Sequence, residues 1–140
     1  MPTRDATAVW EGTLQEGNGK IHIYGQDRPY SFKSRFEEGE GTNPEELIAA
    51  AHAGCYSMAL SGRLAREGFP ATRIQSTAKV HLTRGEAGFS ISQIDLETAA
   101  EVPGITNEKF QELALGAKEG CPVSVALKAV TITLNARLVS

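Results

Sequence analysis

The sequence lacks the signals of several large protein classes. No stretch is apolar for long enough to cross a membrane, and no apolar segment follows a basic start. Basic residues are not in excess: the net charge is -3 and the isoelectric point is about 5.6, which argues against nucleic-acid binding. A phosphate loop, a GxGxxG turn and a Ser/His/Asp order are also absent. We therefore expect a single globular domain over residues 1–140, located in the cytosol.

Cysteine is scarce, with only Cys55 and Cys121 in the chain. In a reducing compartment such a pair is more often catalytic, redox-active or metal-binding than a permanent structural disulfide, although two unrelated core residues would look the same. A zinc site built from His52, Cys55 and Cys121 would lack an evident fourth ligand, and the familiar paired spacings are missing. We expect no metal and no cofactor.

Alternating apolar residues and helical periodicity predict both strands and helices, with an antiparallel meander over the first three strands. Turn signals fall at residues 16–19, where Asn18-Gly19 favours a tight hairpin, at residues 25–29 and at residues 85–88. A shift in apolar parity predicts a bulge near Ser92-Gln93. Residues 34–42 have the composition of a loop. The predicted strands cover residues 5–15, 21–23, 30–32, 74–82, 89–100 and 129–138, and the predicted helices cover residues 43–67, 106–120 and a short segment from 122.

The longest predicted helix contains Cys55. Asn43 is a suitable cap, Pro44 suits the first helical position and Glu46 completes a capping-box pattern. The helix has an apolar stripe, which puts Cys55 at a packing surface and predicts a buried thiol. Burial raises a thiol pKa, and Cys55 is too far from the helix start for the dipole to activate it. If Cys55 reacts, another part of the chain must supply a cation. The stripe is Leu47, Ala51, Cys55, Met58 or Ala59, and Gly62.

Cys121 precedes Pro122, which fits the first position of a short helix. Cys121 would then cap that helix, with backbone N–H groups facing its sulfur. This position could lower its pKa, so the order in which the two cysteines react stays open.

Three other side chains are candidates for the same site. Arg35 is either a solvated loop charge or the cation that Cys55 needs. Glu45 either favours the helix dipole or shares the site, but ten helical positions separate it from Cys55, about 15 Å. A shared site would therefore take Glu45 from a second copy of the chain, in a two-fold dimer. His52, one turn before Cys55, is either its base or a histidine bonded within the helix packing; His22 and His81 lie in predicted strands and have the pattern of structural residues.

Two motifs, residues 41–55 (GTNPEELIAAAHAGC) and residues 121–124 (CPVS), resemble those of the OsmC/Ohr family of thiol peroxidases. The residues of the first motif resemble the OsmC branch of that family. The order of elements matches over nearly the whole chain; Gly54 stands where the family often has alanine. The resemblance implies an α+β fold and an intertwined homodimer, with antiparallel sheets wrapped around central helices and active sites at the interface.

The resemblance also implies a function in oxidative and osmotic stress defence: reduction of organic hydroperoxides to alcohols, and of hydrogen peroxide less well. Cys55 corresponds to the cysteine that attacks the peroxide, Cys121 to the resolving cysteine, and Arg35 and Glu45 to the pair that activates the thiolate. An external dithiol, such as a lipoyl protein, would reduce the disulfide. The alternative is a non-enzymatic dimer that binds a small ligand or a lipid and whose cysteines are core residues.

Overall fold

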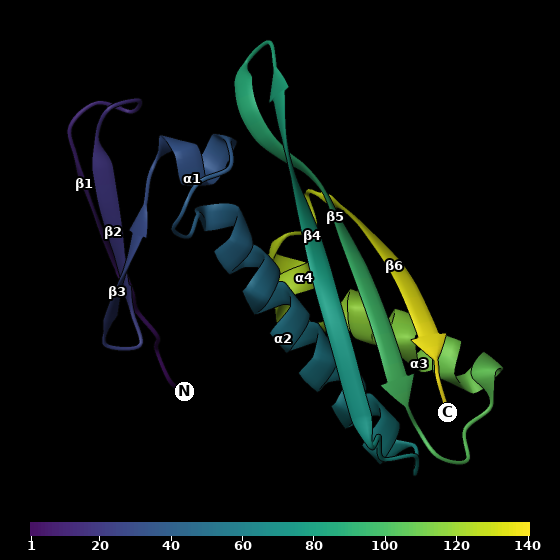
Figure 1. Cartoon of the computed structure of the whole chain (residues 1–140). Coiled ribbons are helices and arrows are strands. Elements are labelled where there is room, and N and C mark those ends of the chain that lie inside the picture. Colours follow the sequence, from purple (N-terminus) through teal and green to yellow (C-terminus); the bar gives the residue numbers. More distant parts are fainter. The chain divides into compact units, whose positions relative to one another are not determined.

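The computed structural model describes residues 1–140, which form two compact units, residues 1–47 and residues 48–140 (Figure 1). Each unit contains a three-stranded sheet and helix, so the α+β class is confirmed. No helix combines the length and the apolar character that a membrane crossing requires. The elements of the first unit are β1 (Thr7–Glu11), β2 (Asn18–Ile23), β3 (Gln26–Tyr30), α1 (Phe32–Phe36) and the start of α2 (Pro44–Arg66).

The first unit is an antiparallel meander in the order β1-β2-β3, as predicted, but its first turn differs from the prediction. Asn18 and Gly19 lie in β2, and the chain reverses earlier, where the N–H of Gly17 donates to the carbonyl of Thr13. Gly19 is needed for packing. A Cβ there would lie 2.5 Å from the Tyr30 ring and 2.7 Å from the Trp10 ring.

The second half of this unit corrects two more predictions. The turn is confined to Tyr24 and Gly25, both with positive φ, and residues 26–30 form β3. Pro29 is tolerated because β3 is an edge strand, where a missing N–H interrupts no ladder on the open side. Phe32 begins α1 and is not the last residue of a strand. Arg35 therefore lies on a helix, in a segment for which a loop was predicted.

Helix α2 begins and ends where the sequence predicts. The side-chain oxygen of Asn43 accepts a hydrogen bond from the backbone N–H of Glu46 at 2.8 Å, and Gly68, with φ of 89°, follows the helix. The predicted capping box is incomplete, because the Glu46 carboxylate accepts from the Thr42 hydroxyl, at 3.4 Å.

The predicted apolar stripe of α2 was wrong by one position. Beyond the first turn, the buried residues are His52, Tyr56, Leu60 and Leu64, whereas Ala51 and Met58 are exposed. Cys55 lies at the border of the packed face and is only partly buried. Small and apolar residues occupy two faces of α2, and periodicity alone does not distinguish the face that meets the core.

The second unit has one mixed sheet in the order β4-β5-β6. The β4–β5 hairpin is antiparallel and contains the predicted bulge: His81 pairs with Gln93 and Leu82 with Ile91, so Ser92 is the extra residue. β6 pairs with β5 in parallel, unlike the expected antiparallel arrangement. The crossover through two helices makes this possible. The elements are β4 (Arg73–Gly85), β5 (Gly88–Glu101), α3 (Asn107–Gly120), α4 (Pro122–Ala126) and β6 (Thr131–Leu138).

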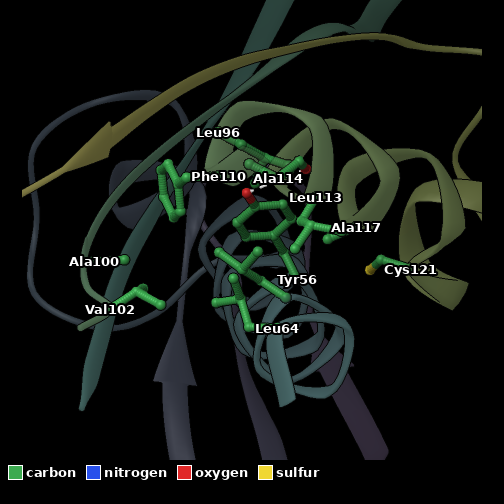
Figure 2. Packing of buried hydrophobic residues seen from close by; sticks show 11 residues of the cluster. Tyr56, Leu64, Leu96, Ala100, Val102, Phe110, Leu113, Ala114, Ala117 and Cys121 are labelled. Atoms are coloured by element: carbon green, nitrogen blue, oxygen red, sulfur yellow. Dashed lines mark hydrogen bonds between the residues drawn. The ribbon is translucent and has the colours of Figure 1, made fainter. Parts of the chain in front are cut away.

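One face of this sheet packs against α2 and α3, and the core lies between them (Figure 2). Tyr56 is fully buried there and donates from its hydroxyl to the carbonyl of Ala114 at 3.4 Å. Cys121 is part of this buried cluster, and Cys55 packs against it. The core therefore fixes the helix segments that carry both cysteines.

Candidate functional site

The structure brings Cys55 and Cys121 together. They are 66 positions apart, and their Sγ atoms lie 2.9 Å from each other as free thiols. Cys55 projects from the middle of α2, and Cys121 stands at the junction between α3 and α4. Cys121 has no exposed surface, whereas Cys55 is partly accessible. The pair has the geometry of a dithiol that can form a disulfide with little movement.

Burial raises the pKa of the Cys55 thiol, and the neighbouring Cys121 adds to the rise. The backbone N–H of Val123 donates to the Cys55 sulfur and opposes this effect. Among residues 48–140, no lysine or arginine contributes to the pKa of Cys55. Within this unit, Cys55 therefore remains a protonated thiol at neutral pH.

The prediction for Cys121 was correct about the helix and wrong about the sulfur. Pro122 occupies the start of α4 and Cys121 is its N-cap, but the Cys121 side chain makes no capping hydrogen bond. The N–H of Val123, in the first turn, is directed to Cys55. The start of α4 thus stabilises a negative charge on the cysteine of the other helix, which sequence spacing could not indicate.

Arg35 and Glu45 form an ion pair in the first unit, with Arg35 Nε 2.9 Å from Glu45 Oε1. The Ser34 hydroxyl donates to the Thr42 carbonyl at 2.7 Å, and the Asn43 amide donates to the Ser34 carbonyl at 2.9 Å. These bonds fix α1 to the segment that begins α2. Glu45 is buried, and its Oε2 has no hydrogen-bond partner. The two side chains therefore meet through a single contact.

Arg35 also lines an apolar recess of about 420 Å³ in the first unit. Its guanidinium lies 5.1 Å from the centre of the Phe36 ring, and Trp10 and Tyr30 stand with their ring centres 5.3 Å apart. A cation at the wall of an aromatic recess suits a ligand with a polar end and an organic group. The recess is lined by Trp10, Gly12, Leu14, Tyr30, Ser31, Phe32, Arg35 and Phe36.

His52 does not contact Cys55 through a hydrogen bond. Its Nε2 lies 2.7 Å from the Ser124 hydroxyl, both residues are buried, and its Nδ1 has no partner. Burial lowers the pKa of His52, so the ring is neutral. Of the two roles considered for His52, these contacts agree with a histidine that is hydrogen-bonded within the helix packing. Sequence reasoning missed Ser124, although its place in the CPVS motif was a signal. His22 and His81 lie in strands and pair with Asp27 and Asp95.

Comparison with known proteins gives a consistent result. A family model described as OsmC-like protein matches residues 37–135. The peroxiredoxin OsmC of Escherichia coli (strain K12) is 48% identical over 136 residues, which cover 95% of this chain and 94% of that protein. The organic hydroperoxide resistance protein of Xanthomonas axonopodis pv. citri (strain 306) is 32% identical over 100 residues, covering 69% and 68%. The structure of an OsmC like protein from Mycoplasma pneumoniae has a TM-score of 0.78 over 99% of each chain, and at 15% identity this likeness concerns the fold.

Proposed function

The chain belongs to the family of OsmC-like proteins, and we propose that it is a thiol-dependent peroxidase of oxidative and osmotic stress defence. It reduces organic hydroperoxides to alcohols, and hydrogen peroxide less well. The whole chain acts as one functional domain in the cytosol, where the dithiol is kept reduced. The observation that carries the proposal is the 2.9 Å separation of the Cys55 and Cys121 sulfurs.

Cys55 is the residue that attacks the peroxide. As a thiolate it bonds to one peroxide oxygen, the O–O bond breaks, and the alkoxide leaves and takes up a proton to become the alcohol. Its partial exposure gives the substrate access, whereas Cys121 is closed to solvent. The N–H of Val123 stabilises the thiolate.

Arg35 supplies the cation that the second unit does not. An opposite charge within about 4–6 Å lowers a pKa by roughly 1–3 units, enough to offset the effect of burial on Cys55. Glu45 orients the guanidinium through Nε, which leaves the two terminal nitrogens free to donate to the peroxide. The aromatic recess beside Arg35 accepts the organic group, which explains a preference over hydrogen peroxide.

Cys121 resolves the intermediate. Its sulfur attacks the sulfenic sulfur of Cys55, water leaves, and a disulfide forms. An external dithiol then reduces this disulfide and is itself oxidised to a disulfide; a lipoyl protein is the partner that we propose. The cycle consumes one peroxide and one dithiol and needs no metal or cofactor.

The active form is a homodimer with shared sites. Glu45 is ten positions from Cys55, about 15 Å along a helix, so one chain's Arg35–Glu45 pair serves the cysteines of its partner. One face of α2 is exposed and made largely of small residues, and a side chain on Gly54 would meet nothing within 4 Å. The unpartnered Oε2 of buried Glu45 is consistent with a site that a second chain completes. The exposed face consists of Ala50, Ala51, Gly54, Met58 and Ser61.

A thiol count tests the peroxidase proposal. One equivalent of cumene hydroperoxide should remove both thiols of the wild-type protein and yield the alcohol. Cys55→Ser should abolish turnover, and Cys121→Ser should stop at a sulfenic acid on Cys55 that dimedone labels. An unchanged thiol count in the wild type would instead support the non-enzymatic alternative, in which the cysteines are core residues.

A further inference from the structure

A buried polar contact runs beside the cysteine pair and joins the same two helices. His52 Nε2 lies 2.7 Å from the hydroxyl of Ser124, across 72 positions of sequence. His52 is one helical turn before Cys55, and Ser124 is three residues after Cys121. His52 therefore precedes Cys55 by three residues, and Ser124 follows Cys121 by the same number.

The contact is not explained by packing or by acid–base chemistry. An apolar side chain would fill the core without leaving Nδ1 unpartnered in a buried position, which is a cost to stability. His52 has no exposed surface, and its hydrogen bond goes to Ser124 and not to Cys55. The ring makes its hydrogen bond to Ser124 and none to Cys55, so it is placed to hold Ser124.

Helix α4 needs such a contact because it is short. It has five residues, and isolated helices of that length are unstable in water, so tertiary contacts must fix its position. Two groups of the site depend on α4: the sulfur of Cys121, the residue at the N-cap position, and the N–H of Val123, which donates to Cys55. Ser124 is the next residue along the chain.

We propose that His52 and Ser124 are positioning residues that hold α4 against α2, so that the Cys121 sulfur stays close enough to Cys55 to form a disulfide. This inference rests on the proposed function for its catalytic consequence. Once Cys55 is a sulfenic acid, attack by Cys121 forms the S–S bond and releases water. A second peroxide competes by oxidising the same sulfur to a sulfinic acid. Holding Cys121 at 2.9 Å favours the disulfide.

The test is Ser124→Ala, followed by stopped-flow kinetics with cumene hydroperoxide. Formation of the sulfenic acid should slow by a smaller factor than closure does, because neither residue touches the peroxide and only the Val123 N–H links α4 to the Cys55 thiolate. Closure of the disulfide should slow at least tenfold, and sulfinic Cys55 should appear by mass spectrometry at about tenfold lower peroxide. Ser124→Thr, which keeps the hydroxyl, should restore closure to within threefold.

Two variants separate positioning from general destabilisation. Ser57→Ala removes another hydrogen bond of α2, the 2.8 Å contact with Ser76 on β4, and should leave closure unchanged. The double variant His52→Gln with Ser124→Ala should close the disulfide no more slowly than the slower of the two single variants. Both changes break the same contact, the hydrogen bond between His52 and Ser124. Closure within twofold of wild type in Ser124→Ala, or equal slowing in Ser57→Ala, would overturn the inference.

An equilibrium measurement keeps the inference testable apart from peroxidase activity. In a glutathione redox buffer, Ser124→Ala should lower the equilibrium constant for the Cys55–Cys121 disulfide at least tenfold, which corresponds to about 30 mV. An unchanged constant would contradict the positioning role. A wild-type protein that consumes no peroxide but shows the tenfold shift would refute the proposed function and leave this inference standing.

Discussion

Arg35 donates to Glu45 through Nε alone, at 2.9 Å from Oε1, and Oε2 of the same buried carboxylate has no partner in the chain. The pair thus fixes the direction of the guanidinium while leaving its terminal nitrogens uncommitted to Glu45. This arrangement suits a cation that must act on another group. It also makes the identity of the basic residue important, because lysine has no equivalent of Nε.

Replacing Arg35 by lysine should lower kcat/KM for cumene hydroperoxide by about 10², the loss typical of removing one oriented donor from a reaction site. The fold should remain intact, since Arg35 is partly exposed and a positive charge is kept. Steady-state kinetics and circular dichroism measure the two effects. Arg28→Lys, on exposed β3, is the matched control and should keep full activity. Unchanged turnover in Arg35→Lys would rule out the activating role.

The pH dependence of alkylation should report the cation's effect on Cys55. Burial raises the pKa of this thiol in its own unit, so the uncharged form is favoured unless a cation acts on it. With Arg35 present, iodoacetamide should modify Cys55 first, with a midpoint below the ordinary thiol pKa of about 8.5. In Arg35→Met the midpoint should lie above that value. Mapping the first alkylated cysteine by mass spectrometry checks the assignment, and early labelling of Cys121 would reverse the two roles.

The raised pKa of the Cys55 thiol also has a consequence for the stability of Arg35→Met. A pKa of Cys55 that is raised in the folded state stabilises the protein at pH values below the unfolded pKa, and this contribution is lost as pH rises through the folded value. The variant should therefore lose stability to urea above about pH 8.5 more steeply than the wild type. Parallel curves for the two proteins would mean that Arg35 does not act on the Cys55 thiol.

Enlarging Gly54 should separate the proposed dimer. The position is on the exposed face of α2 and has no atom within 4 Å of a built Cβ, so Gly54→Leu leaves the single chain unstrained and improves helix propensity. Between two closely packed helices the leucine would prevent contact. Light scattering should give a monomer mass, and peroxidase activity should fall with it. Gly54→Ala adds only a methyl group and should stay dimeric; a dimeric Gly54→Leu would mean that the interface lies elsewhere.

The outcome of the sequence predictions follows a physical distinction between local and distant contacts. The starts of α2 and α3 were predicted correctly because the side-chain oxygens of Asn43 and Thr106 accept hydrogen bonds from the backbone N–H three residues ahead. The bulge at Ser92 could also be predicted from the sequence, since it changes the parity of apolar residues within one strand. Gly19 was misread as a turn residue because its role depends on two aromatic rings from neighbouring strands.

The sequence by itself determined the helical settings of Cys55 and Cys121, the capped start of α2 beside Glu45, and the scarcity of other reactive groups. Only the tertiary structure decided that the two sulfurs meet, that Val123 donates to Cys55, that Arg35 stands on a helix and bonds Glu45 through one nitrogen, and that His52 bonds Ser124. Caps and turns depend on residues a few positions apart. Most of these contacts join residues 10 to 72 positions apart, and their geometry depends on how separate elements pack, which periodicity does not encode.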